Sequence, residues 1–344
     1  MNASVIKTID YDKDGDLDLF IGNNSKYNSF GKMPDCYLLN NNKGVFSIVQ
    51  SRTFAAIGMV TDALVTDFNK DGSQDVIVVG EWMKPKFFAN TKGNFKEVTE
   101  TVLPGNQNGL WQSITSFDID QDGDQDYLVG NWGMNSKFKS SQEFPMKMYY
   151  DDFDANGTFE TIVTIEKNGK YYTTMGLDEL VEEFSGMLKK KFNTYKSFAG
   201  KTVDEIFDVA MLEKAALYEV YNLKSGYLRN DKGKFTFVPF SNKMQVSPIT
   251  SFVKADFDGD GAAIGGRNIG RVAAEGQGAG IEAQPRGQGG AIGQGGRDGD
   301  QVVIRVCESA SRQGKALRAT GAPLLVADST HHRWAADDRH QRTC

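Results

Sequence analysis

Asp118-Ile119-Asp120-Gln121-Asp122-Gly123-Asp124-Gln125-Asp126 is the stretch that decides the fold. Counted from its first residue, it places aspartate at positions one, three, five and nine and glycine at position six. Calcium takes about six to eight oxygen ligands, and carboxylates on alternate residues of a curled loop can supply them. Glycine suits the sharp turn of such a loop, because without a Cβ it adopts positive φ at no steric cost. The stretch therefore predicts a calcium-binding loop.

The pattern recurs four more times. The copies that begin at Asp10 and Asp67 are complete, the copy at Asp152 is looser, and the copy at Asp256 is unfinished because Ile264 stands at position nine. We expect side-chain oxygens as ligands at positions one, three, five and nine and the backbone carbonyl at position seven. The candidate metal ligands, in chain order, are Asp10, Asp12, Asp14, Asp16 and Asp18; Asp67, Asn69, Asp71, Ser73 and Asp75; Asp118, Asp120, Asp122, Asp124 and Asp126; Asp152, Asp154, Asn156, Thr158 and Glu160; and Asp256, Asp258 and Asp260.

An EF-hand is the first alternative to test. Its loop needs a bidentate glutamate at position twelve and a helix on each side. Position twelve of the four complete loops is instead Ile21, Val78, Val129 and Val163. Each lies in a short β-branched run that is typical of a strand. The sequence therefore predicts a strand–loop–strand arrangement.

A second motif accompanies the loops. Asn41–Phe46, Asn90–Phe95 and Asn230–Phe235 share the pattern Asn-x-Lys-Gly-x-Phe, which predicts a hairpin turn with a positive-φ glycine. From each turn glycine to the next acidic loop there are 23, 25 and 23 residues. The repeating unit is then strand, acidic loop, strand, strand, turn and strand, with a period of about fifty residues. Four antiparallel strands at that period indicate an all-β fold, a β-propeller with about five blades visible, and a β-sandwich is the weaker alternative.

Between the loops at Asp152 and Asp256 the pattern changes. Over residues 177–221, apolar residues recur at three- and four-residue steps up to Gly200, and Thr202-x-x-Glu205 then predicts a capping box that opens a second helix through Leu217. We interpret 177–221 as a helical insertion in the fourth blade. The third unit has no Asn-x-Lys-Gly turn directly after its loop, so we expect that its outer strands are lost.

Charge and composition divide the chain at residue 261. Residues 1–261 carry a net charge of −9 and residues 262–344 a net charge of +3, within a total of −6. The acidic part argues against a nucleic-acid partner, which needs clustered lysine and arginine. Residues 262–344 are rich in Gly, Ala, Gln and Arg and poor in large apolar residues. This composition predicts a disordered tail or the product of a frame error or chimeric join.

Cellular location follows from three observations. Cys36, Cys307 and Cys344 make no disulfide framework, and no apolar run approaches the roughly 20 residues that span a membrane. The strand-like VIKTID directly after the first residues is not a leader peptide. Carboxylate-rich calcium loops nevertheless suit a calcium-rich exterior. We expect an extracellular, cell-surface or periplasmic protein whose sequence here is truncated.

The acidic loops, together with strand endings such as LFIGNN, VIVVGEW and YLVGNWG, resemble the FG-GAP/VCBS repeat family over residues 1–261. This family includes integrin-α-like propellers and bacterial proteins similar to cartilage acidic protein. The resemblance implies Ca²⁺ in the loops, an extracytoplasmic location and a role in adhesion or recognition. It also implies a propeller that is incomplete in this chain.

Other features allow two readings each. Trp82, Trp111 and Trp132 lie near strand ends and could stack on sugars, although packing between blades is the simpler interpretation. The helical insertion is either a packed cap or a docking site for a partner.

Enzymatic functions find little support in the sequence. The only histidines are His331, His332 and His340 in the tail, so residues 1–261 offer no imidazole base. No nucleophile elbow, P-loop or dinucleotide fingerprint is present. We therefore expect a calcium-stabilised module that binds a protein or a glycan and is not an enzyme. The alternative is a propeller enzyme that cleaves polysaccharide with carboxylates alone, as a glycosidase or lyase.

Overall fold

The computed structural model describes residues 3–26, 30–49, 52–120 and 122–254, with 262–263, 299–300 and 302–306. The chain divides into two units, 1–308 and 309–344, and all described residues lie in the first. The predicted fifth acidic loop at Asp256–Gly261 lies outside the described residues. No helix in the described part is long and apolar enough to cross a membrane.

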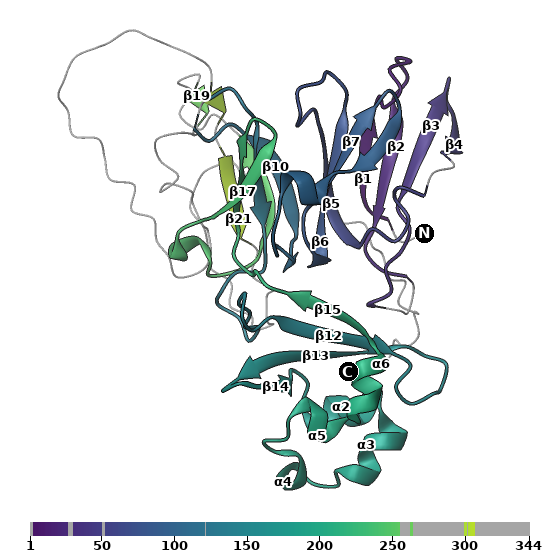
Figure 1. Ribbon diagram of the computed structural model, residues 1–344, viewed down its shortest axis with the longest axis vertical. Coiled ribbons are helices and arrows are strands. Elements are labelled where there is room, and N and C mark those ends of the chain that lie inside the picture. Colours follow the sequence, from purple (N-terminus) through teal and green to yellow (C-terminus); the bar gives the residue numbers. More distant parts are fainter. Residues whose placement is uncertain are drawn as a thin grey trace, which may run out of the picture. The chain divides into compact units, whose positions relative to one another are not determined.

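Three four-strand antiparallel units, which we call the first, second and third repeat sheets, carry the sequence repeat (Figure 1). The first has the order β1 (Ala3–Ile9), β2 (Asp18–Asn23), β3 (Tyr37–Asn42) and β4 (Val45–Ile48). The second has the order β5 (Met59–Thr66), β6 (Asp75–Met83), β7 (Lys86–Thr91) and β8 (Asn94–Glu97), with β9 (Gly109–Leu110) also on β6 and the short helix α1 (Thr99–Val102) after β8. The predicted all-β architecture of four-stranded units is confirmed at this level.

The third repeat sheet corrects one prediction. Its order is β10 (Ser113–Phe117), β11 (Asp126–Gly130), β16 (Gly226–Asp231) and β17 (Lys234–Pro239). The prediction that the third unit lost its outer strands is therefore wrong, because β16 and β17 complete it and carry the third Asn-x-Lys-Gly turn. The chain leaves this sheet after β11 and returns at β16, and the two ends meet where the Asn131 N–H donates to Ser225 Oγ at 2.9 Å. Since the ends are adjacent, a long segment fits between them without disturbing the pairing.

That segment forms a sheet and a helical layer of its own. The inserted sheet has the order β14 (Lys170–Thr173), β13 (Glu160–Lys167), β12 (Met146–Asp151) and β15 (Ala216–Val220). Its helices are α2 (Leu177–Glu183), α3 (Ser185–Lys191), α4 (Tyr195–Phe198), α5 (Val203–Ile206) and α6 (Val209–Lys214) (Figure 1). The fourth acidic loop therefore belongs to this inserted sheet, and the insertion interrupts the third repeat sheet instead of a fourth blade.

The helical prediction for residues 177–221 holds in part. Leu177, Phe184, Leu188 and Phe192 are buried in one cluster with Phe153 of the fourth acidic loop. The first predicted helix is divided at Phe184, where α2 ends and α3 begins, and again after Lys191, so that Tyr195 begins α4. The capping box forms as predicted: the Thr202 N–H donates to Glu205 at 2.9 Å. The predicted second helix is two short helices, α5 and α6, and does not continue through Leu217. Leu217 lies in β15, because strand pairing with β12 overrides the helical pattern there.

Apolar clusters fill the spaces between consecutive repeat sheets. Phe20, Leu38 and Phe54 meet Val78 and Phe88 between the first and second sheets. A second cluster, between the second and third sheets, contains Ile77, Phe87, Trp111, Tyr127 and Phe235. Following the third sheet, η1 (Asn242–Met244) leads to β18 (Ile249–Lys254), whose Ile249 packs with Phe117 and Leu128. In the remaining pairs, β18 lies beside β21 (Val302–Val306) and β19 (Ala262–Ala263) beside β20 (Gly299–Asp300).

The tryptophans favour packing over sugar stacking. Trp82 and Trp111 are 5% and 0% exposed. Trp132 is partly buried against Phe138, with 5.7 Å between the ring centroids. The first two have no face available to a sugar, so the packing interpretation applies to them.

Candidate metal centres

Each of the four complete acidic loops joins two antiparallel strands. The loops connect β1 to β2, β5 to β6, β10 to β11 and β12 to β13. The position-six glycines all adopt positive φ, as expected for the turn: Gly15 (91°), Gly72 (82°), Gly123 (89°) and Gly157 (86°). Position twelve lies in a strand each time, which confirms the strand–loop–strand arrangement and excludes an EF-hand.

The position-nine carboxylate of each repeat sheet is buried and bound to two parts of the backbone. Asp18, Asp75 and Asp126 are 0%, 0% and 1% exposed. One oxygen of each accepts a hydrogen bond from the N–H of loop position two, at 3.2, 3.2 and 2.9 Å. The other oxygen accepts from the N–H of the asparagine that opens the Asn-x-Lys-Gly turn, at 2.7 Å in all three sheets. The two sequence markers are thus in direct contact.

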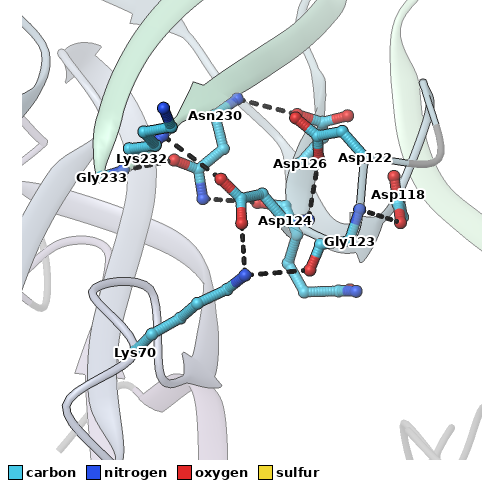
Figure 2. A network of polar contacts seen from close by, with 10 residues as sticks. Lys70, Asp118, Asp122, Gly123, Asp124, Asp126, Asn230, Lys232 and Gly233 are labelled. Carbon is cyan, nitrogen blue, oxygen red and sulfur yellow. Dashed lines mark hydrogen bonds and ion pairs between the residues drawn. The ribbon is translucent and has the colours of Figure 1, made fainter.

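The turn asparagine completes this contact with its side chain. Asn41, Asn90 and Asn230 donate from Nδ2 to the carbonyl of loop position eight at 3.0, 3.0 and 3.1 Å. Their Oδ1 atoms accept from the turn glycine N–H at 2.7, 2.9 and 2.7 Å. We call the position-nine carboxylate and the turn asparagine the loop–turn latch; Figure 2 shows it in the third repeat sheet.

Burial raises the pKa of the position-nine carboxylates. Desolvation raises the pKa of Asp18, Asp126 and Glu160, and it raises the pKa of Asp75 to about 7. The backbone N–H donors act in the opposite direction, since they favour the ionised form. The other carboxylates of each loop add to the rise. A cation beside the latch would favour the charged form again.

Three loops bring three carboxylates to one point. In each of these groups, one oxygen per residue lies within 4.8 Å of the others: Asp10, Asp12 and Asp18; Asp118, Asp120 and Asp122; Asp152, Asp154 and Glu160. Position one supplies a buried Oδ1 without a hydrogen-bond partner in the first and third loops, at Asp10 and Asp118. A buried carboxylate oxygen left without a partner is costly. These oxygens therefore fit a hard cation that takes oxygen ligands.

The second loop is arranged differently. Asp67 accepts hydrogen bonds from the N–H groups of Asp71 and Gly72, at 3.1 and 2.8 Å. Asn69 supplies an amide in place of a carboxylate and donates to Asp71 Oδ2 at 3.1 Å. Within the described residues this loop makes no group of three acidic side chains around one point. Its ligand set would carry one charge fewer than that of the third loop.

The fourth loop keeps the loop hydrogen bonds and has another turn. Glu160 is 4% exposed and accepts the Phe153 N–H at 3.0 Å, as the position-nine aspartates do. The hairpin that follows it turns at Asn168 and Gly169, and the Gly169 N–H donates to Glu166. Glu160 therefore lacks the asparagine contact and forms no loop–turn latch.

In the first and third loops, the position-seven side chain contacts the hairpin turn of the same sheet. Asp16 accepts the Lys43 N–H at 2.9 Å, and Asp124 accepts the Lys232 N–H at 3.2 Å. Asp124 also pairs with Lys70 of the second loop, which donates to the Gly123 carbonyl at 3.1 Å (Figure 2). The ion pair lowers the pKa of Asp124. These side-chain contacts agree with a position-seven ligand that is a backbone carbonyl.

Contacts between neighbouring loops were not predicted. The Asp10 N–H donates to Gln74 Oε1 at 2.7 Å, and Asn90 Nδ2 reaches the Tyr11 carbonyl at 2.8 Å. With the Lys70–Asp124 ion pair, they connect the first, second and third loops. Lys70 and Gln74 occupy positions four and eight of the second loop, and Lys13 and Gln125 stand at the same positions of the first and third loops, but this recurrence does not indicate a contact between loops. The asparagines were visible as turn residues, although not as partners of the acidic loops.

A comparison with protein-family models identifies the repeat. The FG-GAP-like repeat matches residues 10–78 and 67–129. Each match begins at position one of an acidic loop and ends at position twelve of the next, so each spans two successive loops. A search of curated proteins finds no match. Residues 10–129, from the first acidic loop to β11, therefore consist of FG-GAP-like repeats.

Proposed function

We propose that the protein is a calcium-binding recognition module, that its repeat sheets are blades of a β-propeller, and that it acts outside the cytoplasm on a protein or glycan ligand. FG-GAP-like repeats are typical of propeller-like adhesion or recognition modules, which supports the class of function. The observation that carries the calcium proposal is the unpartnered buried oxygen at position one of the first and third loops, beside two further carboxylates.

Calcium in this role is structural. The third loop offers Asp118, Asp120 and Asp122 around one point, with Asp126 held by backbone N–H groups from the loop and from the hairpin turn. A cation bound there would neutralise the carboxylate cluster and fix the loop against the turn. Because one ion pair and two hydrogen bonds connect the first three loops, ordering one loop would support its neighbours.

The test is calorimetric titration of the metal-free full chain with Ca²⁺, together with its melting temperature in calcium and in chelator. At about 100-fold saturation, each site stabilises the folded state by roughly 2.7 kcal/mol, so calcium should raise the melting temperature by many degrees. Mg²⁺ should substitute poorly, since it requires a tighter octahedral shell. Equal melting temperatures in calcium and chelator would contradict the proposal.

Asp122→Asn tests one loop. The amide keeps an oxygen that can accept the Asp124 N–H, which Asp122 Oδ1 now accepts at 2.8 Å, and it removes one charge. Calcium affinity of the third loop should fall while the metal-free melting temperature stays constant or rises, because repulsion is relieved. Asp231→Asn, on the exposed hairpin turn, is the matched control and should change neither value. An equal drop in melting temperature with and without calcium would make Asp122 a structural residue instead.

We also propose that the ligand is a protein or a glycan and that the protein catalyses no reaction on it. A glycan array and a reducing-sugar release assay on the same preparation separate a binding module from the polysaccharide-cleaving alternative. Binding without sugar release supports the module. Release that is lost on substitution of loop carboxylates would support the enzyme.

A further inference from the structure

The helices of the insertion leave a space beside the inserted sheet. α5 and α6 lie next to this sheet (Figure 1), and a cavity of about 610 Å³ is lined by residues of these helices and of β12, β14 and β15. We call it the insertion cavity. Ligand pockets commonly measure roughly 300–1,000 Å³, so the insertion cavity has room for a small ligand or a short peptide segment. No described residue that lines it is a candidate metal ligand or belongs to a loop–turn latch.

Aromatic and apolar side chains form the floor and rim of the insertion cavity. The strand register places Tyr149, Tyr171 and Leu217 on one face of the inserted sheet. The helices contribute short side chains, among them Val203 and Val209, which do not cover the two tyrosine side chains completely. Val209 and Leu217 are 49% and 46% exposed, which is high for apolar side chains. A ligand in the cavity would therefore contact apolar surface that the chain itself leaves open to water.

The insertion cavity also carries an excess of negative charge. Its charged lining residues are Asp204, Glu205 and Glu213, which are acidic, and Lys170, which is basic. Glu205 is already engaged, because it accepts the Thr202 N–H in the capping box and pairs with a lysine of the preceding turn. Asp204 and Glu213 are exposed and have no hydrogen-bond or ion-pair partner among the described residues, and the same holds for Lys170. Two free carboxylates therefore line the cavity beside one free ammonium group.

One tyrosine of the floor already holds a cation from the chain itself. Lys147 Nζ lies 4.4 Å from the centroid of the Tyr171 ring and 3.9 Å from a carboxylate oxygen of Glu219. A cation over an aromatic face is attracted by the negative charge of that face, and more strongly away from water. Tyr149 has similar surroundings: burial raises its pKa, and the carboxylates of Glu219 and Asp204 add to the rise. Negative charge therefore acts on the Tyr149 side chain, which favours a cation beside it.

We propose that the insertion cavity binds a basic segment of a partner protein, whose lysine or arginine side chain lays its aliphatic stem on Val209 and Leu217 and directs its charge toward Asp204 and Glu213. Charge complementarity identifies this occupant, because such a side chain combines an apolar stem with a positive head. A neutral sugar would leave the negative charge of the cavity uncompensated. The inference rests on the recognition role proposed above and names, for this cavity, a protein as the ligand.

The first experiment varies the ligand. The full chain is titrated by calorimetry with the peptide acetyl-Leu-Lys-Leu-amide, with the analogue that carries norleucine in place of lysine, and with the analogue that carries glutamate. Norleucine keeps the aliphatic stem and removes the amine, so it should bind about tenfold more weakly, and the glutamate peptide more weakly still. Affinity for the lysine peptide should also fall as the salt concentration rises, because ions screen the partly exposed carboxylates.

The second experiment varies the cavity. Asp204→Asn combined with Glu213→Gln keeps the shape of both side chains and should weaken binding of the lysine peptide by about five- to tenfold. Lys170→Gln should act in the opposite direction and strengthen it by about twofold, because it removes a like charge. Glu182→Gln, on an exposed position of α2 outside the cavity, is the matched control and should change nothing. All these variants should melt within about 2 °C of the wild type and keep its response to calcium.

Three outcomes would overturn the proposal. Equal affinity for the lysine and norleucine peptides would make the cavity an apolar groove that does not recognise charge. No binding of the lysine peptide at millimolar concentration, to a chain that melts cooperatively, would show that the cavity takes no basic side chain. A glycan whose binding is lost in the Asp204→Asn and Glu213→Gln chain would assign the cavity to a sugar. None of these results touches the calcium titration, and the glycan outcome would still support a recognition module, so this proposal can fail while the proposed function stands.

Discussion

The loop–turn latch predicts a stability loss that differs among three equivalent asparagines, and Asn90 is the most informative. Asn90→Ala removes three side-chain hydrogen bonds: from Gly93 N–H at 2.9 Å, to the Gln74 carbonyl at 3.0 Å and to the Tyr11 carbonyl at 2.8 Å. The residue is 1% exposed, so water cannot easily replace these partners. At about 1 kcal/mol for each bond, the free energy of unfolding should fall by about 3 kcal/mol.

The counterpart in the first sheet gives the internal comparison. Asn41→Ala removes two such bonds, at 2.7 and 3.0 Å, from a residue that is partly exposed. We expect the unfolding free energy to fall by about 1 kcal/mol for Asn41→Ala, because water can hydrogen-bond to some of the backbone groups that lose their partner. Asn94→Ala is the neutral control, since its exposed side chain makes only a 3.4 Å contact with the Lys92 carbonyl.

Urea unfolding of the three variants, followed by circular dichroism in chelator and in calcium, measures these differences. The latch is made by protein atoms alone, so the order Asn90, Asn41, Asn94 should hold in both conditions. A loss for Asn41→Ala equal to or larger than that for Asn90→Ala would refute the reasoning, because the contact with Tyr11 would then contribute nothing.

Two further predictions follow from the site and the insertion. Burial raises the pKa of Asp75 to about 7, so the folded state binds this proton more tightly than the unfolded state. In chelator, the contribution of the Asp75 proton to the unfolding free energy is full below about pH 4 and is lost as the pH rises through 7. The unfolding free energy of the wild type minus that of Asp75→Asn should therefore decline from pH 5 to pH 8. A difference that does not change with pH would contradict this prediction. Replacing residues 132–224 with a short Gly/Ser linker should preserve the β content and calcium response of the repeat sheets, because Asn131 and Ser225 are already adjacent. Excising residues 177–221 instead removes β15. That deletion should yield a less soluble protein, because the edge of β12 is then exposed.

Local signals in the sequence predicted local structure well. The acidic loops, the strands after them and the hairpin turns each depend on a few neighbouring residues whose backbone conformation is restricted, as the positive φ of Gly123 and Gly233 shows. The capping box at Thr202 is of the same kind. Such features can be predicted from a short stretch of sequence, because the residues that cause them are close together in the chain.

Long-range pairing could not be predicted in the same way. The sequence of β11 does not indicate its partner β16, which begins at Gly226, 96 residues after β11 ends at Gly130. The fourth acidic loop also has the same residue pattern as the other three, although it lies in another sheet. One signal was present: the hairpin after that loop turns at Asn168-Gly169 and lacks the phenylalanine of the repeat. Which strands pair depends on how the apolar faces of all the sheets are buried together. A local sequence pattern does not contain that information.

The latch also explains how the acidic loops can keep their shape before a cation binds. Three carboxylates within 4.8 Å repel one another. In calcium-free protein, hydrogen-bond donors offset that repulsion, and so does Lys70 beside the third loop. In the repeat sheets, the position-nine carboxylate accepts N–H groups from both the loop and the turn, and the position-seven aspartates of the first and third loops accept a further N–H from the turn. These donors order the backbone of the loop when the protein folds. Less conformational entropy is therefore lost when a cation binds. A hairpin turn about 104 residues distant in sequence thereby becomes part of the third candidate metal centre, as the Asn230 N–H on Asp126 shows.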